Sequence, residues 1–223
     1  MQKPVEIFKN VYRFGNKLLT KNLVLGSKTY GEELLNFEGV EYRAWDPYRS
    51  KLAAAINKGL SEFPIKEGAN VLYLGSAEGT TISHISDIVG NYGAIFGVDI
   101  SAKVMQKFLY ICESRKNIVP ILADAAQPME YKENLSGFTI DFLYQDVSQR
   151  EQAVIFLKNA RAYLKSGCYG MLAIKARSIN ATESVKEIVK REVAKLYREF
   201  EIIQRLDLEP YDKEHAMVLC RRK

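Results

Sequence analysis

Apolar and polar positions alternate in a regular way along the chain from Asn70 onward. Short apolar runs that are typical of buried strands alternate with longer segments in which apolar residues recur at helical spacing. The five runs are "NVLYLG" (70–75), "AIFGVD" (94–99), "IVPIL" (118–122), "IDFLYQD" (140–146) and "CYGMLAIK" (168–175). Strands that alternate with helices in this way predict a parallel sheet covered by helices on both faces.

The pattern changes near the C-terminus. "FEIIQRLDL" and "AMVLCRR" are two strand-like runs joined by a short polar segment that leaves no room for a crossover helix. Strands joined so closely pair antiparallel. A mostly parallel sheet with an antiparallel last strand predicts the α/β, Rossmann-like fold of class I methyltransferases.

Three hydroxyl residues are predicted to cap helices, because a side-chain oxygen at that position accepts a hydrogen bond from an unpaired backbone N–H. Ser50 precedes the alanine-rich segment "KLAAAINKGL", and Ser101 precedes a segment with an apolar face at helical spacing. Thr182 is expected to cap a long helix that includes Val185 and Leu196.

The first part of the chain lacks the alternation of strand-like runs and helical segments. In "IFKNVYRFGNKLLTKNLVLG", short β-type runs alternate with Gly and Asn turn signals. We therefore predict two units: a small N-terminal antiparallel β module at residues 1–46 and a methyltransferase domain at residues 47–223.

Composition narrows the class of protein. The 223 residues are 47% hydrophobic and 26% charged, which is typical of a globular protein rather than a disordered one. The N-terminus lacks the apolar core of a signal peptide, which favours an intracellular protein. The three widely spaced cysteines favour buried thiols and argue against a metal site. A net charge of +5 is compatible with a polyanionic partner and equally with a solvated lysine-rich surface.

Polar and glycine residues follow the predicted strands at the edge where parallel sheets bind ligands. Gly75 and Gly79 in "LGSAEGTT" allow a tight turn and a close approach of the backbone to a ligand. Asp99 after the second strand can accept hydrogen bonds from ribose hydroxyls, and Asp124 after the third can accept from an adenine amino group. Each carboxylate alone could equally cap a loop, but together they favour an adenosine site.

Asp146 and Lys175 end the fourth and fifth strands and are therefore expected to lie at one edge of the sheet. A lysine beside a carboxylate can handle a substrate proton, although a structural ion pair is the plainer interpretation. If the sixth strand is parallel to the others, the turn after it brings His215 to the same edge. His84 lies within the helix expected after the first strand and is interpreted as structural.

Taken together, these stretches resemble the fibrillarin family, in particular the compact archaeal fibrillarins without a Gly/Arg-rich arm. The resemblance covers nearly the whole chain and rests on "TKNLVLG", "YGE", "EYRAWDPYRSKLAAAI", "VLYLGSAEGTTISHISDIVG", "DVSQ", "AIKARSI" and "LEPYDKEHA". It implies methyl transfer from S-adenosylmethionine to ribose 2′-hydroxyls of rRNA and tRNA, without a metal. A box C/D guide RNA selects the nucleotide in such complexes, which also contain a Nop-type scaffold protein and a kink-turn-binding subunit.

The resemblance also implies the residues of the site. The catalytic set would be Lys51, Asp146, Lys175 and His215. Besides the glycine loop, the cofactor would be held by Thr80, Thr81, Asp99, Ile100, Asp124, Ala125, Asp146, Val147, Ser148 and Gln149. Glu78 stands in the glycine loop where family members usually have a small residue, so its carboxylate would either attract the cofactor ammonium or point to solvent.

Two other functions fit parts of the pattern. A scaffold subunit of an RNA–protein complex could keep the cofactor fold without activity, but it would not need the four polar residues at one edge. A small-molecule O-methyltransferase usually encloses its substrate under extra helices, whereas this chain adds only a small β module. The expected location is the cytoplasm of an archaeal cell.

Overall fold

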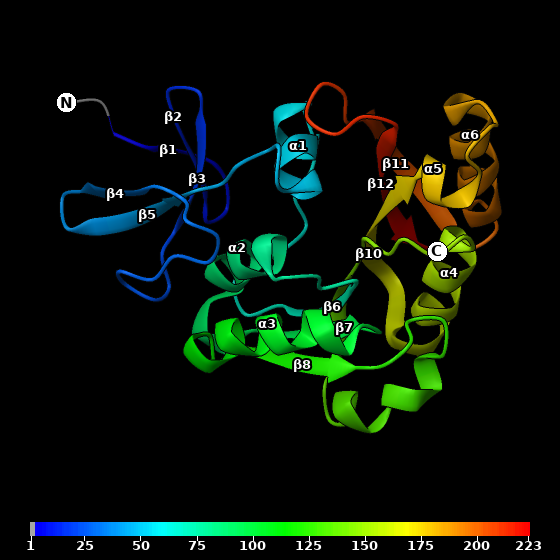
Figure 1. Cartoon of the computed structure of the whole chain (residues 1–223), viewed down its shortest axis with the longest axis horizontal. Helices are drawn as coiled ribbons and strands as arrows, with labels where there is room; N and C mark the ends of the chain where they lie inside the picture. The colour runs from blue at the N-terminus through cyan, green and yellow to red at the C-terminus, as the bar shows by residue number, and fades with distance from the viewer. Residues whose placement is uncertain (1–2) are drawn as a thin grey trace.

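The computed structural model describes residues 3–223 and places two β-sheets next to each other (Figure 1). The smaller sheet is antiparallel and has the strand order β1-β2-β3-β5-β4. Its strands are β1 (Val5–Phe8), β2 (Val11–Phe14), β3 (Lys17–Lys21), β4 (Leu34–Phe37) and β5 (Val40–Ala44). The division of the chain at residue 46 falls between the last of these strands and the first helix, and it stays a prediction.

The larger sheet has seven strands in the order β11-β12-β10-β9-β6-β7-β8. They are β6 (Asn70–Leu74), β7 (Ala94–Asp99), β8 (Ile118–Leu122), β9 (Ile140–Gln145), β10 (Leu164–Lys175), β11 (Phe200–Asp207) and β12 (His215–Arg222). Only β12 runs against its neighbours, so β11 has the direction of the parallel strands. The predicted fold class is confirmed.

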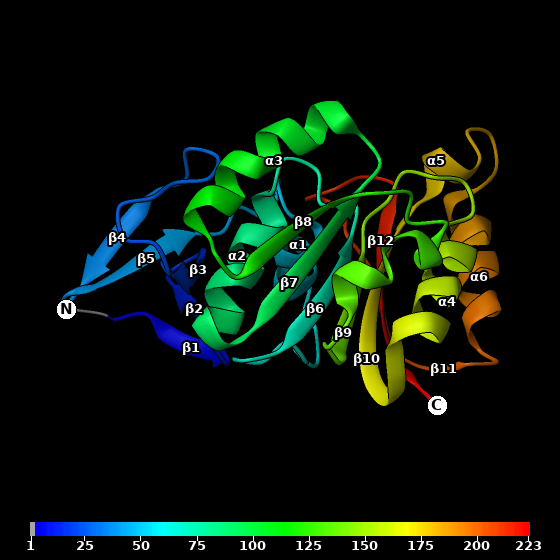
Figure 2. The same ribbon diagram turned by 90° about the horizontal axis from the view of Figure 1, so that it is seen from below.

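Helices cover both faces of the larger sheet, as Figure 2 shows for α2 and α3 beside β7 and β8 and for α4 beside β10, while α6 packs against α4, β11 and β12. The helices are α1 (Lys51–Asn57), α2 (Thr80–Val89), α3 (Ala102–Ser114), α4 (Gln152–Tyr163), α5 (Ala176–Ile179) and α6 (Val185–Leu196), with short 3₁₀ turns at Gly90–Tyr92, Pro128–Tyr131 and Glu133–Leu135. Val71 and Tyr73 pack with α1, α2 and α3, whereas Leu72 and Leu74 pack with α4 and α6. Burial on both faces explains why the strand sequences are continuously apolar.

Two of the three predicted helix caps are confirmed. The hydroxyl of Ser50 accepts from the backbone N–H of Ala53, and the hydroxyl of Ser101 accepts from that of Val104, each at 3.3 Å. The cap at Thr182 is wrong, because α6 begins only at Val185. The side chain of Asn180 accepts from the N–H groups of Thr182 and Glu183 and holds this segment in a turn instead.

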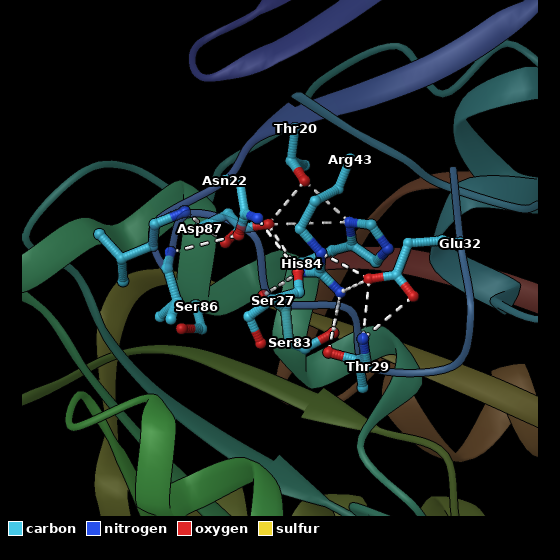
Figure 3. Close-up of polar contacts among 12 residues, drawn as sticks. Thr20, Asn22, Ser27, Thr29, Glu32, Arg43, Ser83, His84, Ser86 and Asp87 are labelled. Carbon is cyan, nitrogen blue, oxygen red and sulfur yellow. Dashed lines mark hydrogen bonds and ion pairs between the residues drawn. The ribbon is translucent and has the colours of Figure 1, made fainter. Parts of the chain in front are cut away.

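A buried network of charged and polar groups, which we call the junction network, joins the small sheet to the α/β unit (Figure 3). It consists of Thr20, Glu32, Arg43, His84, Asp87 and Arg115. The Arg43 guanidinium donates to Glu32 at 2.7 Å and to Asp87 at 2.8 Å, and Arg115 donates to the other oxygen of Asp87 at 2.6 Å. Two buried arginines therefore share one carboxylate on α2.

His84 lies within this network, which agrees with its interpretation as a structural residue. Its two ring nitrogens lie 2.8 Å from the hydroxyls of Thr20 and Tyr30, and its ring stacks on Trp45. Burial, together with the charges of Arg43 and Arg115, holds the pKa of His84 well below its ordinary value. The imidazole is therefore neutral and acts as a hydrogen-bonding member of the core.

Among residues 3–223, no helix combines the length and the apolar character needed to cross a bilayer. The predicted intracellular location stays a prediction.

Candidate active site

The sheet topology brings the four predicted catalytic residues together at the carboxyl edge of the parallel strands. Lys175 ends β10 and His215 begins β12, and the two are direct partners in the antiparallel pairing of these strands. Asp146 follows β9, which is the other neighbour of β10. Lys51 reaches the same place from the first turn of α1. The predicted position of His215 at this edge is confirmed.

Asp146 is the shared anion of this cluster. Its carboxylate lies 3.3 Å from the Lys51 ammonium and 2.9 Å from the Lys175 ammonium. Lys175 also donates to the Asp146 backbone carbonyl at 2.9 Å and to the Ser148 hydroxyl at 3.0 Å. The side chains of Lys51, Asp146 and Lys175 are only 14–16% exposed, so solvent screens their charges weakly.

A fifth residue, Asp212, belongs to the cluster and was not identified from the sequence. One oxygen of its carboxylate lies 3.3 Å from the Lys51 ammonium, and the other is hydrogen-bonded to Nδ1 of His215. Asp212 lies in the turn between β11 and β12, three residues before His215. That spacing in "YDKEHA" was the available signal, but spacing alone does not show that the two side chains meet.

The charges in the cluster fix each other's protonation. Burial alone would lower the pKa of Lys51, but the carboxylates of Asp146 and Asp212 outweigh it and raise this pKa above its usual value. Burial would likewise raise the pKa of Asp212, yet His215 and Lys51 hold it below its usual value. Lys51 is therefore a cation and Asp212 an anion at neutral pH.

A pocket of about 340 Å³ opens beside this cluster at the same edge of the sheet. It is lined by Gly75, Ala77, Val98, Asp99, Ile100, Asp124, Ala125, Asp146, Val147, Ser148, Gln149 and Lys175. Its volume lies in the range of small-molecule sites. Because Asp146 and Lys175 belong to both the pocket and the polar cluster, a ligand in the pocket would meet a second reactant at the cluster.

The two glycines of the loop after β6, Gly75 and Gly79, have different structural roles. A Cβ on Gly75 would lie 2.6 Å from the backbone oxygen of Asp146, so only glycine lets this loop approach the loop after β9 at the pocket. A Cβ on Gly79 would instead lie 2.4 Å from a methyl carbon of Ile111 on α3. Gly75 therefore shapes the pocket, whereas Gly79 permits the packing of α2 against α3.

Asp99 and Asp124 hold loops and also line the pocket. Asp99 accepts from the backbone N–H groups of Ala77 at 3.0 Å and Ser101 at 2.9 Å. Asp124 accepts from the N–H of Ala126 and from the Gln149 side chain, both at 2.9 Å. An ionised carboxylate has about four acceptor sites, so both residues keep capacity for a ligand.

Three other residues of the glycine loop and α2 are placed away from the pocket lining. Thr80 and Thr81 begin α2, and the Thr81 hydroxyl donates to Ser50 at 2.9 Å, which ties α2 to the start of α1. Glu78 points to the surface, where its side chain is 61% exposed and pairs with Lys107 on α3. The charge of Glu78 is therefore directed to solvent rather than into the pocket.

Comparison with known proteins agrees with this geometry. The sequence model of the family described as Fibrillarin matches residues 2–223. The chain belongs to the fibrillarin family. It is 50% identical over 206 residues to a fibrillarin-like rRNA/tRNA 2′-O-methyltransferase of Pyrococcus furiosus, an alignment that covers 92% of this chain and 90% of the relative.

Three solved fibrillarin structures have the same fold. The fibrillarin pre-rRNA processing protein of Methanococcus jannaschii superposes with a TM-score of 0.93 at 42% identity, covering 99% of this chain and 97% of that one. Aeropyrum pernix fibrillarin with natively bound S-adenosyl-L-methionine gives 0.86 at 44% identity, covering 99% and 100%. The fibrillarin chain of a fibrillarin/Nop5p complex gives 0.87 at 38% identity, covering 98% and 100%.

Proposed function

We propose that this protein transfers a methyl group from S-adenosylmethionine to ribose 2′-hydroxyls of rRNA and tRNA. The observation that carries the proposal is a small-molecule pocket that shares two residues, Asp146 and Lys175, with a partly buried Lys-Asp-Lys-His cluster. The relative from Pyrococcus furiosus is named for this activity, and the Aeropyrum pernix homologue binds this cofactor.

The pocket residues fit the cofactor. Asp99 would accept hydrogen bonds from the ribose hydroxyls and Asp124 from the adenine amino group, while Ile100 and Ala125 offer apolar contacts beside them. The backbone at Gly75 and the loop Asp146–Gln149 would hold the rest of the molecule. When bound, S-adenosylmethionine supplies a methyl group on a positively charged sulfur, so the chain itself needs only to bring the ribose oxygen into line.

The polar cluster would prepare the ribose hydroxyl. A hydroxyl is a poor nucleophile, and a group that orients it and accepts its proton lowers the barrier to attack. We assign Lys175, held by the carboxylate and the carbonyl of Asp146, as the base or the orienting group. As an ammonium it would orient the hydroxyl, and it would accept the proton only in its neutral amine form. Lys51 stays cationic and would position the hydroxyl or a neighbouring phosphate. His215 would orient the substrate from the other side of Lys175.

Replacing Asp99 by Ala is expected to weaken S-adenosylmethionine binding on the order of tenfold or more, because hydrogen bonds to a charged acceptor are lost. Calorimetry on the full chain measures this directly. Asp141→Ala is the matched control, since Asp141 accepts from the backbone N–H of Asn70 at the opposite end of the strands. Unchanged affinity in Asp99→Ala, in a variant that melts as a folded protein, would contradict the assignment.

His215→Ala is expected to slow methyl transfer without eliminating it. His215 begins β12 in the hairpin at the edge of the sheet and would orient the substrate, so its loss costs alignment rather than the proton-accepting group. Single-turnover rates in the assembled complex test this ranking. A variant as inactive as Lys175→Ala would make His215 a proton carrier, and a rate equal to wild type would make the turn merely structural.

RNA methylation by this chain would require partners. A net charge of +5 is a small electrostatic footprint for finding one nucleotide in a long RNA. We propose that a box C/D guide RNA, a Nop-type scaffold protein and a kink-turn-binding subunit complete the enzyme in the archaeal cytoplasm. The fibrillarin/Nop5p complex supports the scaffold partner.

The test is transfer of labelled methyl to a guide-matched RNA, with the chain alone and with the three partners added. We expect incorporation that depends on the guide and on the partners, and only weak, salt-sensitive RNA binding by the chain alone. Efficient, site-selective methylation by the isolated chain would contradict the requirement for partners, and no transfer in the full complex would contradict the proposed function.

A further inference from the structure

Asp212 connects two members of the polar cluster that do not touch each other directly. Its carboxylate bonds Nδ1 of His215 through one oxygen and lies 3.3 Å from the Lys51 ammonium through the other. The turn that carries it is itself held in place, since the backbone N–H of Asp212 donates to the Leu208 carbonyl at 3.1 Å and the N–H of Leu208 donates to the His215 carbonyl at 3.1 Å. The carboxylate is thus fixed relative to both partners.

We propose that Asp212 is a positioning residue for methyl transfer: it holds the His215 ring in the tautomer that carries hydrogen on Nδ1, so that Nε2 offers a lone pair to the ribose hydroxyl. The role in catalysis rests on the proposed function, whereas the tautomer does not.

The tautomer of His215 follows from what each group can donate or accept. An ionised carboxylate only accepts hydrogen bonds, so the hydrogen between Asp212 and His215 must belong to Nδ1. In a neutral imidazole the second nitrogen is then an acceptor. The contacts with Lys51 and His215 keep Asp212 ionised, because they hold its pKa below the usual value despite partial burial. The same logic applies wherever a carboxylate orients a catalytic histidine.

Lys51 makes this arrangement testable by a nearly isosteric change. In Asp212→Asn, the new side-chain amide faces the Lys51 ammonium at one end. Because an ammonium only donates hydrogen bonds, the amide oxygen is expected to turn toward Lys51. The amide NH₂ group then faces Nδ1 of His215 and needs an acceptor there. The ring is forced to place its hydrogen on Nε2, and the lone pair offered to the substrate is lost.

The decisive measurement is the ¹⁵N spectrum of the histidine side chains in the full chain near pH 9, above the ordinary histidine pKa of about 6.5. The chain has two histidines, and buried His84, which lies far from this turn in sequence, serves as the internal reference. We expect the Nδ1–H tautomer for His215 in wild type and the Nε2–H tautomer in Asp212→Asn, with His84 unchanged. A wild-type ring with hydrogen on Nε2, or on both nitrogens, would overturn the proposal, as would an unchanged tautomer in the variant.

Activity in the assembled complex tests the second half of the proposal. Asp212→Asn is expected to lower kcat about tenfold to a hundredfold, as for a misaligned reactant, with little change in KM for RNA. Glu214→Gln is the matched control, because it removes a carboxylate from the same turn that pairs outward with Arg177. A switched tautomer with an unchanged kcat would overturn the positioning role. If wild type itself transfers no methyl, the proposed function fails while the tautomer result stands separately.

Discussion

Replacing Lys175 by Ala is expected to abolish methyl transfer, lowering the single-turnover rate roughly a hundred- to ten-thousandfold, while S-adenosylmethionine binding stays measurable. Lys175 ends a central strand, and its ammonium is fixed by the Asp146 carboxylate, the Asp146 carbonyl and the Ser148 hydroxyl. Asp146→Ala should be equally inactive, because it releases both lysines from their shared anion.

Lys165 offers a matched control on the same strand. It lies near the opposite end of β10, where its exposed side chain bonds the Thr139 hydroxyl, so Lys165→Ala should transfer methyl at the wild-type rate. Lys175→Arg separates two roles of the charge, since arginine keeps the cation but cannot release its proton. Substantial activity in Lys175→Arg would show that the cation suffices and that another group accepts the proton. Wild-type activity in Lys175→Ala would remove Lys175 from the mechanism altogether.

Asp87→Ala is expected to cost about 3–5 kcal/mol of folding free energy, because it leaves two buried guanidinium groups without their shared carboxylate. The side chains of Arg43, Arg115 and Asp87 are at most 1% exposed, so water cannot compensate the lost contacts. The hydroxyl of Thr20 and the backbone N–H of Leu23 also lose an acceptor. Denaturant unfolding measures the change as a lower midpoint.

An exposed pair in the same small sheet provides the control for this effect. Glu33 pairs with Lys17 at the surface, with side chains 52% and 41% exposed, so Glu33→Ala should change stability by less than about 1 kcal/mol. Equal destabilisation by Asp87→Ala and Glu33→Ala would contradict the importance of burial. If only the small sheet melts in Asp87→Ala, as a separate transition, the network would hold the two sheets together without stabilising the larger one.

The arrangement of the strands follows from the sequence because their chemistry is local. Each central strand is buried on both faces and therefore reads as one apolar run, as in "AIFGVD", whose bounds of 94–99 match β7. The caps at Ser50 and Ser101 are also local interactions within four residues. Thr182 is also a hydroxyl residue before a segment with helical spacing. The side chain of Asn180, however, accepts hydrogen bonds from the backbone N–H groups of Thr182 and Glu183.

Contacts between distant segments could not be predicted in this way. Arg43 and Asp87 are 44 residues apart and meet only because the small sheet packs on α2. Gly79 looked like part of a ligand loop, yet the side chains that exclude a Cβ there come from α3. Strand order alone placed Asp146, Lys175 and His215 at one edge, whereas the link from His215 through Asp212 to Lys51 required the path of the turn.

We expect the methylated atom to be the ribose 2′-oxygen of the nucleotide that the proposed guide RNA selects. Mapping the methyl group by alkaline hydrolysis and mass spectrometry of the product RNA, with the complex assembled on two guides shifted by one nucleotide, tests it most directly. We predict one hydrolysis-resistant linkage per target, at the guide-paired nucleotide, that moves by one position with the guide. A methyl group on a base, or on a ribose whose position does not follow the guide, would contradict the account.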